Sequence, residues 1–104
     1  MKPKEKILAK IRETVQAVEP EAEVFLFGSQ ARGDARPDSD WDILILTPYP
    51  AGLKEEQKFR HKLFELELEF GLAISTFVYS KKDWESKHRV TPLYKNVKRE
   101  GVRI

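Results

Sequence analysis

A continuous apolar run, Ile43-Leu-Ile-Leu46, constrains the fold of this 104-residue chain more than any other segment. A strand with one solvent face alternates apolar and polar residues, whereas a strand covered on both faces is apolar throughout. The run therefore predicts a buried strand from Trp41 to Thr47, in a sheet that has helices on both faces. Two other segments, residues 23–27 and 73–79, are the remaining predicted strands.

Apolar residues at helical spacing predict helices before, between and after these strands. The first helix is expected from Lys4 to Val18, and the second ends at Gly71. Capping residues predict a short helix that opens at residues 80–83 and a last helix within residues 91–101. The implied fold class is α/β (α+β), with a small mixed sheet packed against helices, in one domain over residues 1–104.

Two aspartates, Asp40 and Asp42, come directly before the buried run. Side chains two apart on a strand share a face, with Cα atoms about 6.5 to 7 Å apart, so both carboxylates can converge on one cation. Trp41, between them, is expected to point into the core on the opposite face. Oxygen ligands with room for water and phosphate suit Mg²⁺, and the chain offers no cysteine or clustered histidine for zinc.

A glycine turn follows the first predicted strand. Gly28 permits a backbone conformation or a close approach that a side chain would forbid, and Ser29 is expected to N-cap a short helix through Arg32. Outward-facing amides at a helix start favour anions. Gly28, Ser29 and Arg32 are therefore the predicted phosphate-binding residues, with Arg32 adding a charge-assisted contact.

These two motifs together resemble the signature of the DNA polymerase β-like nucleotidyltransferase superfamily. Gly28-Ser29, ten intervening residues and then Asp40-Trp41-Asp42 lead into a hydrophobic strand. The words Phe-Gly-Ser-Gln-Ala-Arg-Gly and Ser-Asp-Trp-Asp-Ile-Leu-Ile are similar to those of its smallest members, the minimal nucleotidyltransferase (MNT) domains. Those domains have about this length, so the resemblance spans nearly the whole chain.

The resemblance implies a nucleotidyltransferase fold and a Mg²⁺-dependent reaction. In such proteins a nucleoside monophosphate, here AMP from ATP, moves to a hydroxyl on a partner protein, and pyrophosphate is released. Asp40 and Asp42 would be the catalytic metal ligands, while Gly28, Ser29 and Arg32 would bind the phosphates. The chain also resembles the antitoxin-like partners of HEPN-domain proteins, which makes a HEPN-domain protein the expected partner.

One feature departs from the family pattern. Active members have a third carboxylate on a neighbouring strand, but residues 73–79 contain no acid, and Ser75 or Thr76 stands at that position. A neutral hydroxyl can neither match a carboxylate on Mg²⁺ nor act as a general base near neutral pH. The acidic residues of segment 65–69 could substitute in principle, although alternating acids on a helix are more typical of a solvated face.

Composition sets the remaining expectations. The formal net charge is only +2, which does not favour a dedicated nucleic-acid binder. The chain has no cysteine and no apolar run near the ~20 residues that cross a bilayer, so we expect a soluble cytoplasmic protein without a membrane partner.

Two other functions stay open at this point. The missing acid would fit a catalytically weak pseudoenzyme that binds and occludes a HEPN-type partner. A nucleic-acid-binding module is the less favoured alternative, and it would require a basic stripe and an affinity that falls steeply with salt. The sequence leaves open which nucleotide and which acceptor are used, and whether turnover occurs.

Overall fold

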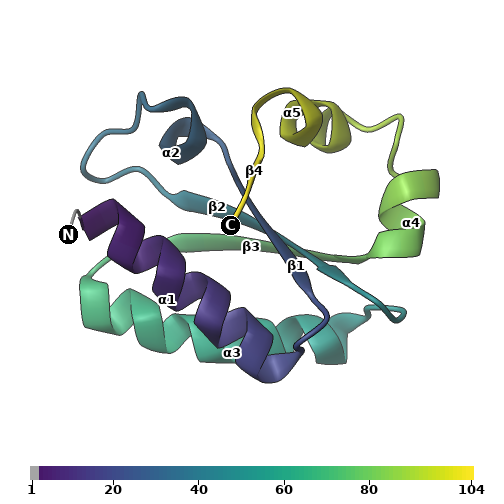
Figure 1. Cartoon of the computed structure of the whole chain (residues 1–104), viewed down its shortest axis with the longest axis horizontal. Coiled ribbons are helices and arrows are strands. Elements are labelled where there is room, and N and C mark those ends of the chain that lie inside the picture. The colour runs from purple at the N-terminus through teal and green to yellow at the C-terminus, as the bar shows by residue number, and fades with distance from the viewer. Residues whose placement is uncertain (1–2) are drawn as a thin grey trace.

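A computed structural model describes residues 3–104 of the chain (Figure 1). Its helices are α1 (Pro3–Val18), α2 (Ser29–Arg32), α3 (Leu53–Phe70), α4 (Lys81–Ser86) and α5 (Pro92–Glu100). Its strands are β1 (Glu23–Phe27), β2 (Trp41–Thr47), β3 (Ile74–Ser80) and β4 (Val102–Arg103). None of the described helices is both long and apolar enough to cross a membrane.

The four strands form one mixed sheet in the order β3-β2-β1-β4. Strand β1 pairs antiparallel with β2 and β4, while β2 and β3 run parallel. The predicted α/β class with a small mixed sheet is therefore confirmed. Strand β4 was not predicted, because its two exposed residues have no periodic pattern. It forms only because the chain returns to β1, where the Ile104 amide donates to the Val24 carbonyl.

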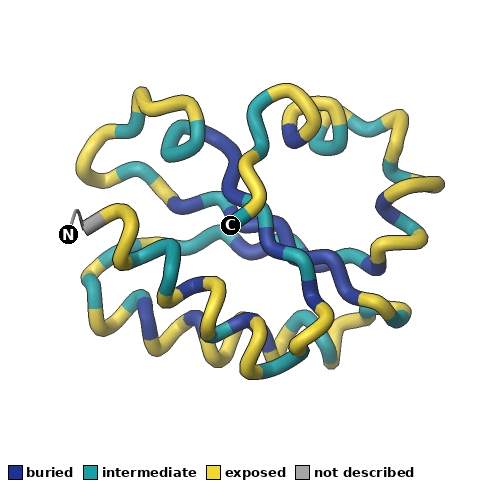
Figure 2. The backbone as a smooth tube through the Cα atoms, in the orientation of Figure 1, coloured by how far each residue is buried: buried dark blue, intermediate teal, exposed yellow. Residues whose placement is uncertain are grey.

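Helices cover both faces of this sheet, as the apolar run predicts. In Figure 1, α1 and α3 lie on one side of the strands and α2, α4 and α5 lie on the other. Ile43 and Ile45 pack with residues of α1 and α3, whereas Leu44 and Leu46 pack with Trp84 and with α5. These four side chains are at most 3% exposed, and Figure 2 shows the buried backbone concentrated in the central strands.

The predicted boundaries agree with the structure to within one residue where both ends were assigned. Strand β3 begins and ends one residue later than expected, because Ser80 both pairs with Thr47 and caps the next helix. Its hydroxyl accepts a hydrogen bond from the Asp83 amide, so strand β3 continues directly into α4. Trp41 is 7% exposed and belongs to the core beside α1 and α3, as predicted.

Candidate functional site

The residues singled out in the sequence meet where β1 ends and where β2 and β3 begin. The strand register places Asp42 opposite Phe27 on β1 and opposite Ser75 on β3. The Ser75 hydroxyl donates to Asp40 Oδ2 at 3.2 Å. Asp40, Asp42, Ser75 and the turn at Gly28 are thus brought together at one end of the sheet, on the face that α2 and α5 cover.

The turn after β1 depends on Gly28. Its backbone has φ 76° and ψ −160°, a conformation that is essentially restricted to glycine. A Cβ atom at this position would collide with the Asp42 carboxylate. Gly28, rather than the predicted Ser29, is the N-cap of α2, and its carbonyl accepts from the amides of Ala31 and Arg32. Ser29 is the first helical residue instead, because only glycine fits the cap position beside Asp42.

Negative charge accumulates at the two aspartates. Partial burial raises the pKa of Asp42, nearby Asp40 and Glu100 raise it further, and Arg32 opposes the shift. A bound cation would favour the ionised form of Asp42. The described residues contain no group of three or more acidic, histidine or cysteine side chains placed to hold a metal. Two carboxylates still suit Mg²⁺, since this ion commonly retains waters and takes its remaining ligands from substrate phosphates.

Glu100, the last residue of α5, belongs to the site although the sequence analysis did not identify it. Its carboxylate accepts the Gly28 amide at 3.1 Å, and both of its oxygens accept from Arg32 Nη1 at 3.2 Å. The Glu100 side chain is only 12% exposed. No local pattern could reveal this contact, since 72 positions separate Glu100 from Gly28.

Arg32 is held by acidic side chains on two sides. Besides Glu100, its Nε donates to Asp34 Oδ2 at 3.2 Å. Glu100 therefore engages the Gly28 amide and the Arg32 guanidinium, both of which belong to the predicted phosphate-binding residues. An incoming phosphate would compete with this carboxylate for the same donors.

The structure separates the two hydroxyl residues considered for the third acidic position. Ser75 lies on the face of Asp42 and contacts Asp40, whereas Thr76 is 8% exposed and pairs with Ile43 of the opposite face. Ser75 is therefore the residue that stands beside the two aspartates. Among residues 74–80, which form β3, no side chain is acidic.

Comparison with known proteins gives a family and a set of related structures. The sequence model of a family described as "Nucleotidyltransferase domain" matches residues 8–103. A protein of Methanocaldococcus jannaschii, named as a candidate protein adenylyltransferase, is 43% identical over 58 residues. That match covers 56% of this chain and 59% of the relative, so the chain spans less than two thirds of the relative's length.

Two solved structures share the arrangement of helices and strands. One, a toxin–antitoxin with AMP-PNP, has a TM-score of 0.68 at 20% identity and is matched over 91% of this chain and 69% of its own. The other, a candidate minimal nucleotidyltransferase, has a TM-score of 0.62 at 25% identity, with 97% and 95% covered. The fold around the aspartates is therefore the fold of these proteins.

The close approach at Gly28 predicts the effect of adding one methyl group. We expect Gly28→Ala to lower the free energy of unfolding by more than the roughly 1–3 kcal/mol of a strained backbone, because the Cβ also displaces Asp42. Gly33→Ala is the matched control, since Gly33 has φ 86° but nothing within 4 Å of an added Cβ. Urea unfolding of both variants measures the difference, and equal losses would contradict the Gly28–Asp42 contact.

Proposed function

This chain belongs to the nucleotidyltransferase domain family, and from that premise we propose that it transfers AMP from ATP to a hydroxyl on a partner protein. The observation that carries the proposal is the placement of Asp42 against the turn at Gly28, with Asp40 close to Asp42. ATP as donor is supported by a neighbour crystallised with AMP-PNP and by a relative named for adenylyl transfer. We further propose that residues 1–104 act as one domain.

Each side chain in the site has a proposed role. Asp40 and Asp42 hold Mg²⁺, while the amides of Gly28 and Ser29, together with Arg32, bind the terminal phosphates. The metal, when bound, polarises the α-phosphate and balances the charge of the departing pyrophosphate. The acceptor oxygen forms the new bond to the α-phosphorus, and the bond to the β-phosphate oxygen breaks.

The serine at position 75 bears on how the acceptor loses its proton, because active family members have a carboxylate there. The Ser75 hydroxyl donates to Asp40 and so helps to orient that carboxylate. It does not replace the missing general base, because a serine hydroxyl is not basic near neutral pH. No side chain of β3 can therefore take the acceptor proton, and we expect transfer to be slower than in a site with a carboxylate on that strand.

The same residue favours a second candidate function. A domain without the third acid could bind a HEPN-type partner and occlude it, with nucleotide binding retained and little turnover. The toxin–antitoxin structures among the fold relatives support a protein partner for this chain. Incubation with Mg²⁺, ATP and a co-encoded neighbour protein, followed by intact mass of both proteins, separates the two functions. A gain of one AMP on the partner supports transfer, whereas a stable complex of unmodified proteins supports occlusion.

Asp42→Asn should have opposite effects on the free and the nucleotide-bound protein. Burial and nearby Asp40 raise the pKa of Asp42, so its ionised form lowers stability at neutral pH, and the neutral amide should raise the melting temperature. The stabilisation that MgATP gives the wild type should disappear, because a metal ligand is lost. Thermal shift with and without MgATP measures both effects. Asp38→Asn, an exposed change of the same charge, should keep the MgATP shift.

A further test supplies the missing acid. Ser75→Asp should raise the rate of AMP transfer by about 10²- to 10⁴-fold, the usual contribution of a general base in good geometry. Thr76→Asp is the control, since this neighbouring side chain is buried on the other face and a carboxylate there should only destabilise the fold. The readout is pyrophosphate release in the presence of the partner protein. Wild-type transfer that Ser75→Asp leaves unchanged would argue against a missing base.

Glu100 offers a test of phosphate placement. Glu100→Gln keeps an oxygen for the Gly28 amide but removes the charge that pairs with Arg32. We expect ATP to bind more tightly, because one carboxylate no longer competes with its phosphates. Asp34→Asn is the comparison variant: Asp34 also pairs with Arg32, but it is Glu100 that accepts the Gly28 amide, so any gain from Asp34→Asn measures the freeing of Arg32 alone. Titration calorimetry with MgATP checks both, and weaker binding by Glu100→Gln alone would assign the phosphates elsewhere.

A further inference from the structure

Strand β3 leaves a long open edge on the sheet. It has seven residues, and no other strand among residues 3–104 pairs with its outer side. The Trp41 amide donates to the Ala73 carbonyl, and backbone groups of a parallel pair alternate in direction, so those of Ile74, Thr76 and Val78 point away from β2. Arg60 Nη2 indeed donates to the Thr76 carbonyl at 3.2 Å. The opposite edge, β4, has only two residues.

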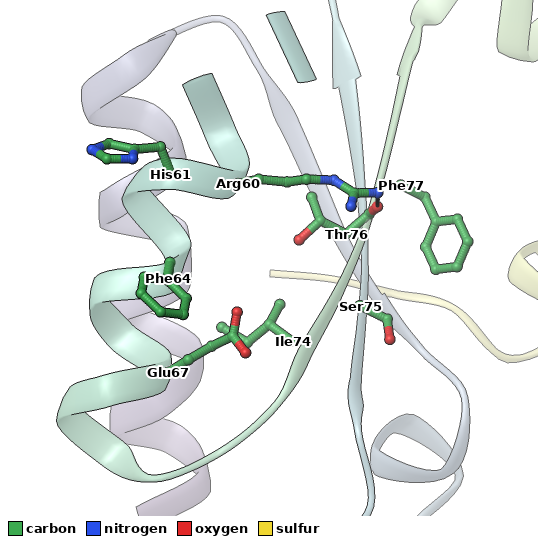
Figure 3. Close-up of a pocket in the computed structure, with 8 residues that line it drawn as sticks. All are labelled: Arg60, His61, Phe64, Glu67, Ile74, Ser75, Thr76 and Phe77. Atoms are coloured by element: carbon green, nitrogen blue, oxygen red, sulfur yellow. Dashed lines mark hydrogen bonds between the residues drawn. The ribbon is translucent and has the colours of Figure 1, made fainter. Parts of the chain in front are cut away.

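A groove of about 660 Å³ follows this open edge between α3 and β3. Figure 3 shows Phe64 and Glu67 projecting from α3 on one side of β3, while Ser75 and Phe77 project from the other side. The buried positions of α3 are filled by Phe59, Leu63 and Leu66, and Phe64 is left 53% exposed. The fold of residues 3–104 therefore leaves an aromatic side chain uncovered beside a strand edge that no other strand pairs.

The groove is continuous with the candidate site. Ser75 lines the groove, and its hydroxyl also donates to Asp40 Oδ2 at 3.2 Å. A chemical group placed at this end of the groove would lie next to the proposed metal ligand. The groove thus leads from the exposed Phe64 to the Ser75 side of the candidate site.

We propose that the outer edge of β3 binds an extended segment of the acceptor polypeptide as an added strand, with its hydroxyl side chain beside Ser75. This inference rests on the proposed function, in which that hydroxyl accepts the AMP. Backbone donors and acceptors at strand spacing complement an extended polypeptide and no other macromolecule. The charges along the groove do not suit a polyanion, because Arg60 is paired with Glu56 at 2.7 Å and Glu67 adds a negative charge.

The geometry of a strand predicts a pattern in the bound segment. Phe64 stands on the α3 side of the sheet, whereas Ser75 faces the opposite side. Side chains of an added strand alternate between these two sides. The hydroxyl residue and the apolar residue that contacts Phe64 must therefore differ by an odd number in sequence position, such as i and i+1 or i and i+3.

Selection from a library of short peptides, each with one central tyrosine, serine or threonine, tests the proposal on the full chain. We expect binders with an apolar residue at an odd distance from the hydroxyl. Methylation of the backbone nitrogens that face β3 should weaken fluorescence-polarisation binding by about tenfold, the effect of roughly one or two hydrogen bonds. Phe64→Ala should weaken it similarly. Leu53→Ala is the control, since Leu53 is 70% exposed on the same helix but outside the groove.

The outcomes separate this inference from the nucleotide site. Both α3 variants should keep the wild-type thermal shift with MgATP. If the wild-type protein binds peptides but shows no thermal shift with MgATP, the proposed function is rejected and the added strand is not. A library that yields no binder, or binders indifferent to nitrogen methylation and to Phe64→Ala, would overturn the added strand. Sedimentation equilibrium tests whether a second copy of this chain occupies the outer edge of β3 instead. A dimer that Phe64→Ala dissociates would assign the edge to that second copy and overturn the proposal.

Discussion

The contact between Gly28 and Asp42 is the constraint on which the rest of the site depends. The register of β1 and β2 places Phe27 opposite Asp42, so the chain must turn immediately beyond Phe27 with no side chain in the way. Glycine meets this demand and also adopts φ 76°, which directs the chain into α2. The outward amides of the turn and the carboxylates of β2 are adjacent for this reason. The pairing of two strands thus positions both halves of the proposed nucleotide site.

Electrostatics disfavours the ionised form of Asp42, and one of the charges responsible comes from α5. Burial and the neighbouring carboxylates Asp40 and Glu100 raise the pKa of Asp42, and Arg32 compensates only in part. A divalent cation would remove this repulsion, which is a physical reason for metal and nucleotide to bind together. Because Glu100 holds both the Gly28 amide and Arg32, a phosphate bound at the turn would compete with the carboxylate at the end of α5.

The two edges of the sheet differ in a way that suits the proposed reaction. Helices cover both faces, and β4 closes only part of one edge, so the seven residues of β3 form the longer open edge of the described structure. Ser75 lies on that strand and contacts Asp40, which joins the open edge to the aspartates. A nucleotide bound at the turn and an acceptor on β3 would therefore approach the aspartates from different sides.

The sequence by itself determined strand β1, the central strand β2 with both faces covered, and the presence of a glycine turn after β1 and two aspartates at the start of β2. These features are local, since a continuous apolar run, a spacing of two and the flexibility of glycine act within a few residues. The site roles of Asp40, Asp42, Gly28, Ser29 and Arg32 stay predictions. Only the tertiary structure decided that Gly28 caps α2, that Ser75 rather than Thr76 faces Asp40, and that β4 and Glu100 return to β1 and its turn. Those contacts join segments far apart in the chain, and their energies depend on strand register and chain return, which no local pattern encodes.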